Sequence, residues 1–281
     1  MNSENPAAEL YLDLLERCLT DTLRPELFRP LDPAAGGLIQ SAKRATTRVL
    51  DTMLRPTPFA FVRRESDDPA VRHEGMDWPA RAETMIGRKR LSQLRNCIRR
   101  VLAEDVPGDL IECGVWRGGA TVFMRAMLKA YSDSRRRVWV ADSFKGLPPS
   151  DCVRYPADAE NDFSVDLALA VGEAQVKANF ERYGLLDDQV RFLPGWFKDS
   201  LPSAPIDRLA VLRADGDMYE STIQIMDNLY PKLSAGGYCI IDDYGALPQC
   251  RLAIEDYRRD HGISEPIERI DWTGVFWRRA A

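Results

Sequence analysis

The chain has 281 residues, which is enough for one large α/β domain or two small ones. Hydrophobic residues make up 45% of it and charged residues 29%, as in an ordinary soluble globular protein. A net charge of -5 and a pI near 5.3 argue against a nucleic-acid-binding protein. No stretch approaches the roughly 20 apolar residues of a membrane-spanning helix, and the N-terminus has no signal-peptide pattern.

The cysteines and histidines restrict the kinds of site that the chain can build. The six cysteines have no C-x-x-C spacing, and several stand in apolar runs. This pattern favours buried, reduced thiols in a cytoplasmic protein over a zinc site or disulfides. The two histidines, His73 and His261, are too few for a histidine-rich metal site, and both are expected at the surface.

Residues 1–75 are predicted to form an N-terminal helical arm or lid. Residues 7–20, "AAELYLDLLERCLT", have the spacing of an amphipathic helix. The apolar face expected for this helix consists of Leu10, Leu14, Leu15, Cys18 and Leu19. A loop rich in Pro and Gly follows, then a second helix over Leu38–Met53 and an irregular, charged stretch. We expect a homodimer to form through this arm.

Residues 76–281 are predicted to form one α/β domain, because helices and strands alternate along them. The expected helices cover 91–102, 120–131, 166–183, 219–233 and 248–262. The expected strands cover 109–114, 136–142, 189–195, 208–215, 238–244, 266–272 and 274–279. Apolar strands indicate a mostly parallel sheet covered on both faces, and the short "TG" favours an antiparallel terminal hairpin. The segment "SAGG" is expected to end the fourth helix as a glycine C-cap.

The strand ends carry the first functional signal, because ligands of open parallel sheets bind beyond the carboxyl ends of the strands. The first strand ends in "ECGVWRGGA", whose G-x-x-x-G-G spacing differs from a dinucleotide fingerprint. Asp142 ends the second strand, 28 positions after Gly114, where a carboxylate can accept both ribose hydroxyls of a nucleoside. Glu112 in a loop without lysine disfavours a phosphate chain and favours S-adenosylmethionine, which carries positive charge. A tight β-to-α turn and a helix-capping Asp142 are the plainer alternatives.

A second group of carboxylates ends two later strands. Asp215 ends one of them, and Asp242 and Asp243 follow the next, with Asp242 27 positions after Asp215. Adjacent strand ends would bring the three together, and hard oxygen ligands in this number suit Mg²⁺. The alternative is that they are caps and turn formers, because Asp is common after strands.

Five blocks in order resemble the macrocin O-methyltransferase family. They are "LIECGVWRGGAT", "DSFKGLPP", "VRFLPGWFKDSLP", "LRADGDMYEST" and "LYPKLSAGGYCIIDDY". These enzymes methylate sugar hydroxyls on macrolide and aminocoumarin antibiotics. The resemblance covers roughly residues 76–281 and implies a class I, Rossmann-like methyltransferase fold, S-adenosylmethionine as donor and a divalent metal, usually magnesium.

The resemblance also implies roles for individual residues. Asp142 would hold the ribose, the segment Thr84–Gly87 would touch the donor, and Asp215, Asp242 and Asp243 would bind the metal. The full set expected to bind the donor is Thr84, Met85, Ile86, Glu112, Gly114, Trp116, Gly118, Asp142, Ser143, Gly195, Trp196, Phe197 and Asp215. Asp217 belongs to the same motif as Asp215, and its role is left open.

The resulting hypothesis is a magnesium-dependent sugar O-methyltransferase that acts on a small-molecule glycoside. Asp215 is the candidate catalytic residue, as acceptor of the hydroxyl proton. A methyltransferase of a catechol or flavonoid would use the same metal chemistry, because adjacent phenolic hydroxyls also chelate. "DGD" at 215–217 also resembles the D-x-D of glycosyltransferases, and a nucleoside-binding scaffold without chemistry is the non-enzymatic alternative.

Overall fold

The computed structural model describes residues 5–23, 28–30, 52–54, 56–59, 62–64, 68–77, 81–159 and 163–280. The helix expected over Leu38–Met53 lies almost entirely outside these residues. Among the N-terminal residues that are described, β1 (Phe28–Pro30) pairs antiparallel with β2 (Val62–Arg64). The short helix α3 (Pro69–Glu74) is capped by Asp68, whose side chain accepts a hydrogen bond from the amide of Ala70, 2.9 Å away.

The first helix, α1 (Pro6–Leu19), forms as predicted but buries a different face. Asn5 caps it by accepting hydrogen bonds from the amides of Ala7 and Ala8. The side chains that it buries are those of Ala8, Leu12, Leu15, Glu16 and Leu19. Leu10 and Leu14, expected on the buried face, are 72% and 50% exposed. The sequence offers two overlapping apolar stripes, and packing against α5 selects the one that contains Leu12.

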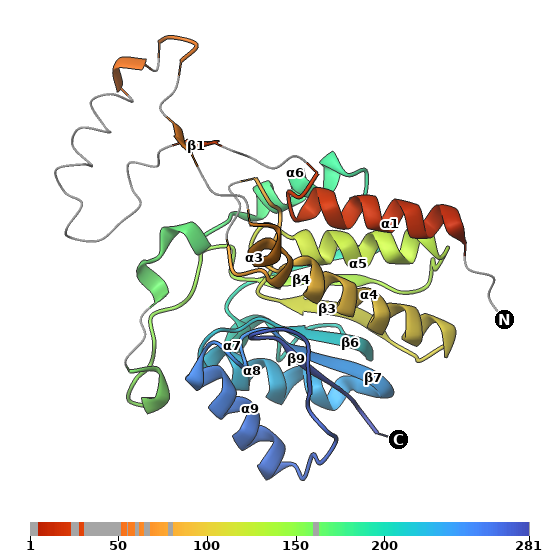
Figure 1. Cartoon of the computed structure of the whole chain (residues 1–281). Coiled ribbons are helices and arrows are strands. Elements are labelled where there is room, and N and C mark those ends of the chain that lie inside the picture. The colour runs from red at the N-terminus through yellow and green to blue at the C-terminus, as the bar shows by residue number, and fades with distance from the viewer. Residues whose placement is uncertain are drawn as a thin grey trace.

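The central sheet has seven strands in the order β5-β4-β3-β6-β7-β9-β8 (Figure 1). The strands are β3 (Asp109–Cys113), β4 (Val138–Asp142), β5 (Val190–Pro194), β6 (Leu209–Ala214), β7 (Leu233–Ile241), β8 (Glu268–Arg269) and β9 (Val275–Arg278). The strands β3 to β7 pair in parallel, whereas β9 runs antiparallel to both β7 and β8. The predicted mostly parallel sheet with its terminal hairpin is confirmed. The chain builds outward in opposite directions from β3 and β6, which puts the topological switch point between these two strands.

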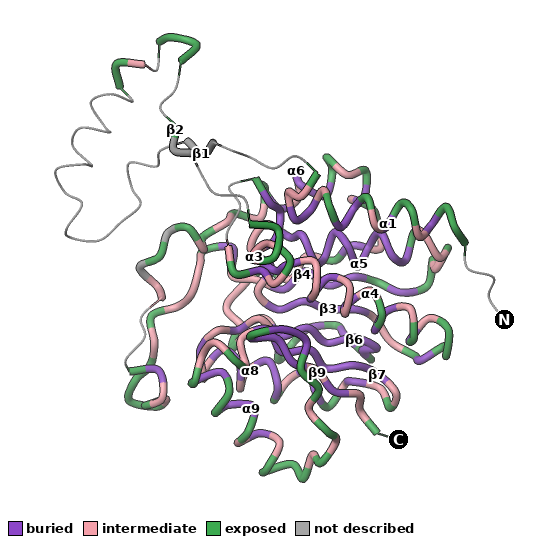
Figure 2. Tube along the Cα trace, viewed as in Figure 1, coloured by how far each residue is buried: buried purple, intermediate pink, exposed green. Residues whose placement is uncertain are grey.

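Helices cover both faces of the sheet (Figure 1). One face is covered by α1, α4 (Arg88–Ala103), α5 (Gly119–Ala130) and α6 (Glu173–Arg182), and the other by α7 (Phe197–Ser200), α8 (Tyr219–Leu229) and α9 (Pro248–Asp260). Successive side chains of a strand point to opposite faces of the sheet, so the sheet separates two hydrophobic cores. Val138 and Val140 of β4 belong to the core on the α5 side, whereas Trp139 and Ala141 belong to the core on the α8 side. Figure 2 shows the buried positions concentrated along the strands and on the helix sides that face them.

Because Leu12, Leu15 and Leu19 belong to the same core cluster as α4 and α5, α1 packs on the main domain. The boundary expected at residue 75 stays a prediction, since much of residues 24–67 lies outside the described ranges. Among the helices that the structure describes, none combines the length and the apolar character needed to cross a membrane.

Two local predictions were wrong. The helix expected over 166–183 begins only at Glu173, after Gly172 in an extended conformation, and 3₁₀ turns at Phe163–Val165 and Leu167–Leu169 precede it. "SAGG" does not cap α8, because that helix ends at Leu229. The residues of "SAGG", 234–237, lie within strand β7. Gly236 has φ +81° where the register of β7 against β6 shifts, so glycine serves a bulge in the sheet.

Candidate active site

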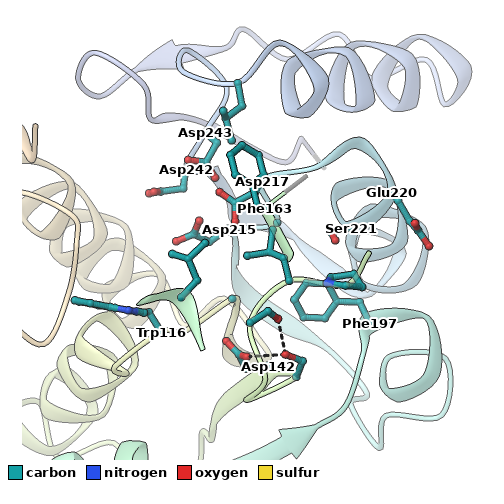
Figure 3. Close-up of a pocket in the computed structure, with 18 of the residues that line it drawn as sticks. Trp116, Asp142, Phe163, Phe197, Asp215, Asp217, Glu220, Ser221, Asp242 and Asp243 are labelled. Atoms are coloured by element: carbon teal, nitrogen blue, oxygen red, sulfur yellow. Dashed lines mark hydrogen bonds between the residues drawn. The ribbon is translucent and has the colours of Figure 1, made fainter. Parts of the chain in front are cut away.

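The carboxyl ends of β3, β4, β6 and β7 open into one cavity of about 710 Å³. Of the residues predicted to bind the donor or the metal, all line this cavity except Gly118 and Gly87, the last residue of the segment expected to touch the donor. In Figure 3, Asp215, Asp217, Asp242 and Asp243 gather on one side of the cavity, and Asp142 lies apart from them. The strand-end carboxylates therefore converge as the sequence predicted.

Gly114 sits at the switch point, where β3 and β6 part. Its φ is +83°, and a Cβ atom on it would lie 2.0 Å from the carbonyl oxygen of Asp215. The amide of Asp215 donates to the carbonyl of Cys113 over 2.9 Å, which holds the two strand ends together. Only glycine fits this close approach, and it sets Asp215 beside the β3 turn.

Two glycines in the turn between β3 and α5, Gly118 and Gly119, have different structural roles. Gly118, the N-cap of α5, has φ +84°, and a Cβ there would lie 2.7 Å from Cγ1 of Val176 on α6. Gly118 therefore allows helix packing behind the cavity. The amide of Gly119 donates to the carbonyl of Glu83 over 2.8 Å. This bond brings the segment beginning at Thr84 over the start of α5, where Thr84, Met85 and Ile86 line the cavity.

The Asp142 carboxylate is held by backbone amides. Its Oδ2 accepts from the amide of Val115 at 2.8 Å, and its Oδ1 accepts from the amide of Phe144 at 2.7 Å. Burial raises the pKa of Asp142, and these amides oppose that rise. The amide of Gly195 donates to the Asp142 carbonyl over 2.9 Å, which brings Gly195, Trp196 and Phe197 to the same cavity. Asp142 thus joins the turns that follow three strands.

The second carboxylate group has the geometry of a cation site. Asp215, Asp242 and Asp243 each offer an oxygen, and these atoms lie within 4.8 Å of one another. The buried Oδ2 of Asp243 has no hydrogen-bond partner among the described residues. Burial and the neighbouring Asp215 raise the pKa of Asp243 well above its usual value. An uncompensated carboxylate oxygen in such a cluster is what a bound cation would satisfy.

Two buried arginines that sequence reasoning missed also neutralise this cluster. Arg213 is 2% exposed, and its Nη1 donates to Glu112 at 2.5 Å and to Asp215 at 3.0 Å. Its Nη2 donates to Oδ1 of Asp242, while Nη1 of Arg90 donates to Oδ2. Burial alone would raise the pKa of Asp242, but the two arginines hold it below its usual value.

Only one of these arginines left a signal in the sequence. Arg213 interrupts the apolar strand "LAVLRA", and a charge inside a buried parallel strand requires a partner. Arg90 lies in a helix rich in Arg and Lys, 152 positions before Asp242, and nothing in its neighbourhood marks it.

Glu112 pairs with Arg213 through Oε1 only. Its Oε2 is buried without a hydrogen-bond partner among the described residues. Burial and the nearby Asp215 and Asp242 raise the pKa of Glu112 to about 8, against the opposing effect of Arg213. The unpartnered Oε2 is therefore open to a cationic ligand, which would stabilise the charged form of Glu112 against this rise in pKa.

The segment after β4 is anchored across the cavity. Asp158 is buried, and its two carboxylate oxygens accept from the amides of Tyr219 and Glu220, at 2.7 and 2.9 Å. It therefore caps α8, whose own N-cap residue, Met218, makes no side-chain capping hydrogen bond. The indole N–H of Trp116 donates to the carbonyl of Ala168 over 2.9 Å. Neither His73 nor His261 lines the cavity.

Comparison with known proteins identifies this architecture. The family model described as Macrocin-O-methyltransferase (TylF) matches residues 8–279. The chain is 50% identical over 277 residues to the 8-demethyl-8-(2,3-dimethoxy-alpha-L-rhamnosyl)-tetracenomycin-C 4'-O-methyltransferase of Streptomyces olivaceus, covering 98% of this chain and 94% of that protein. It is 46% identical over 282 residues to the Mycinamicin III 3''-O-methyltransferase of Micromonospora griseorubida, covering 99% and 100%.

Solved structures agree with this assignment. The O-methyltransferase NovP superposes with a TM-score of 0.81 at 45% identity, over 98% of this chain and 100% of that one. The fold and the strand-end cavity therefore define a class I S-adenosylmethionine-dependent O-methyltransferase. The chain belongs to the macrocin O-methyltransferase family, as its sequence blocks predicted. The D-x-D glycosyltransferase and the inactive scaffold are thereby ruled out.

Proposed function

We propose that this enzyme methylates a sugar hydroxyl of a glycosylated natural product in antibiotic biosynthesis, with Mg²⁺ at Asp215, Asp242 and Asp243. The acceptors named for the two relatives, a rhamnosyl tetracenomycin C and mycinamicin III, support a glycoside. The observation that carries the proposal is the convergence of three aspartate oxygens within 4.8 Å in the cavity that also contains Asp142.

The proposed donor site lies over β3 and β4. Glu112 Oε2 offers a buried acceptor to the ammonium group of S-adenosylmethionine. The Asp142 carboxylate, oriented by two backbone amides, has lone pairs left for ribose hydroxyls. Trp196 and Phe197 supply aromatic surface for the adenine. Gly118 is assigned a packing role instead, because it does not reach the cavity.

The carboxylate oxygens of Asp215, Asp242 and Asp243 are suitable ligands for Mg²⁺. Three carboxylates with one unsatisfied buried oxygen suit a hard divalent cation, which takes oxygen ligands and completes its shell with water or substrate oxygens. Bound Mg²⁺ would lower the pKa of a hydroxyl that it coordinates and would orient that hydroxyl. Arg213 on β6 holds Asp215, which follows the same strand, and Asp242, which follows the neighbouring β7, in place through hydrogen bonds.

Asp215 is the proposed proton acceptor. Bound S-adenosylmethionine would supply the methyl group to the hydroxyl oxygen and would leave as a thioether that keeps the electron pair of the broken S–CH₃ bond, while Asp215 would accept the hydroxyl proton. The hydrogen bond from Arg213 to Oδ2 fixes the orientation of this carboxylate. A positioned base of this kind contributes typically about 10²–10⁴-fold to the rate.

We also propose that the enzyme forms a homodimer and that it is located in the cytoplasm. A homodimer is supported by the exposed side chains of Leu10 and Leu14 on α1, which supply apolar surface, and light scattering would test it. A cytoplasmic location is supported by free thiols at all six cysteines.

A panel assay tests the acceptor class. Purified enzyme with S-adenosylmethionine and Mg²⁺ is offered demethylated macrolide, aminocoumarin and tetracenomycin glycosides, and separately catechols and flavonoids, with products read by mass spectrometry. We expect a single added methyl on the sugar of at least one glycoside. Turnover of the phenols alone would overturn the glycoside proposal, and full activity in excess EDTA would overturn the metal proposal.

A further inference from the structure

The turn between β8 and β9, residues 270–274, lies beside the aspartate cluster, and its residues are buried except for Trp272. Asp271 Oδ1 accepts from the amides of Thr273 and Gly274, at 3.0 and 2.7 Å. Asp271 is buried, and its Oδ2 lies 2.8 Å from Nε of Arg90, which also binds Asp242. These contacts restrain the turn and tie its position to Asp242, one of the proposed metal ligands.

Further hydrogen bonds fasten this turn to the end of β7. The hydroxyl of Thr273 donates to the carbonyl of Asp242 over 2.9 Å, and the amide of Gly245 donates to the carbonyl of Thr273 over 2.8 Å. A Cβ atom on Gly245 would lie 2.5 Å from the carbonyl oxygen of Trp272. The backbone of Trp272 is therefore held against the segment that follows Asp242 and Asp243.

The Trp272 side chain is left out of both hydrophobic cores. It is 39% exposed, and it lines the cavity together with Asp242 and Asp243. Its indole N–H donates to the carbonyl of Glu74, at the end of α3, over 3.0 Å. One edge of the ring is thus fixed, while much of its surface stays open. A large aromatic side chain that is held in place but not packed has a surface available for a ligand.

We propose that Trp272 is the stacking platform for the acceptor sugar ring beside the aspartate cluster. This inference rests on the proposed function. The C–H groups on one face of a pyranose present apolar surface that packs on an aromatic ring, while its hydroxyls point outward to polar partners. A sugar that directs a hydroxyl toward Asp215, Asp242 and Asp243 has its ring within the same cavity as the indole. Trp272 would then select an acceptor ring that has one apolar face and would fix which hydroxyl faces the cluster.

Two substitutions separate stacking from the bond to Glu74. Trp272→Phe keeps an aromatic face and loses the N–H donor, whereas Trp272→Leu loses both. Tyr11→Leu, a partly exposed aromatic on α1 outside the cavity, is the control. The measurements are KM and kcat for the best glycoside of the panel, the affinity for S-adenosylhomocysteine by calorimetry, and the thermal unfolding temperature.

If the ring is the platform, Trp272→Leu raises the acceptor KM about five- to tenfold, as expected for the loss of an aromatic contact. Trp272→Phe raises it by much less, and neither variant changes S-adenosylhomocysteine affinity. Equal KM increases in the two variants would show that only the bond to Glu74 matters, and an unchanged KM in both would also overturn the inference. If the wild-type enzyme methylates no glycoside, the proposed function itself fails, and the platform fails with it.

Discussion

Arg213 on β6 donates a hydrogen bond to Oδ1 of Asp242, the residue that follows the neighbouring strand β7. The same guanidinium binds Glu112 and Asp215, so one buried cation connects the ends of three adjacent strands. A buried charge is tolerated only when it is paired. The carboxylates proposed to bind the methyl donor and the metal thus also neutralise the buried charge of Arg213, which in turn holds them in position.

The first prediction concerns this buried arginine. Arg213→Met leaves Glu112, Asp215 and Asp242 without a shared partner, and breaking a buried pair on one side costs about 3–5 kcal/mol. Urea unfolding should show this loss of stability. Arg17→Met, which removes a surface pair with Asp13, should cost at most about 1 kcal/mol. Equal losses in the two variants would contradict the assigned role of Arg213.

Gly114 provides a second test, because both its positive φ and the close approach of the Asp215 carbonyl require glycine at this position. Gly114→Ala would place a Cβ 2.0 Å from the Asp215 carbonyl at φ +83°. The matched control is Gly184→Ala, which has φ +63° and open space around the added Cβ. The control should lose about 1–2 kcal/mol from the left-handed conformation alone. Gly114→Ala should lose clearly more and also bind S-adenosylhomocysteine more weakly; similar losses would mean that the close approach is unimportant.

Asp142 is predicted to control donor affinity. Asp142→Ala removes the carboxylate that accepts from the amides of Val115 and Phe144 and that is proposed to accept from the ribose. Hydrogen bonds to a charged group contribute about 1.5–3 kcal/mol, so the Kd for S-adenosylhomocysteine should rise at least about tenfold. Asp142→Asn keeps one acceptor oxygen, so its Kd for S-adenosylhomocysteine should lie between those of the wild type and Asp142→Ala. Calorimetry with unchanged affinity in the Ala variant would exclude Asp142 from the donor site.

Asp158 is predicted to hold the start of α8 from another part of the chain. Asp158→Ala frees the amides of Tyr219 and Glu220, so their hydrogen exchange should accelerate and the protein should lose about 1 kcal/mol of stability. Asp68→Ala removes the cap of α3 and should leave exchange at those two amides unchanged. Equally slow exchange in the Asp158 variant would show that the cap is dispensable.

Most of the fold followed from the sequence, and so did the position of the proposed donor and metal residues at one cavity, because these residues lie at strand ends. The alternation of apolar strands with helices indicates a mostly parallel sheet, and parallel strands bring Asp142, Asp215 and Asp242 to one edge without any knowledge of side-chain packing. The arginines were harder to predict. Arg90 reaches Asp242 only because α4 packs beside the strand ends, and this contact joins residues far apart in the chain.

Packing also decided the features that local patterns left ambiguous. The exposed Leu10 and the buried Leu12 both fit a helical stripe, and only contact with α5 distinguishes them. Gly118 and Gly236 looked like a ligand loop and a helix cap, whereas they permit helix packing and a sheet bulge. Glycine marks a place where space or a positive φ is needed, but the sequence does not say which neighbour requires it.

The most direct test of the central claim is a titration of Mn²⁺, as a spectroscopic probe for Mg²⁺, into the enzyme bound to S-adenosylhomocysteine, followed by electron paramagnetic resonance. The wild-type enzyme and Asp188→Asn, which changes an exposed carboxylate after α6, should each bind one ion per chain in competition with Mg²⁺. Asp243→Asn, which alters the carboxylate with the unsatisfied buried oxygen, should lose that site while keeping its affinity for S-adenosylhomocysteine. Absence of binding to the wild type, or the same binding in Asp243→Asn, would contradict the assignment of this cluster as the metal centre.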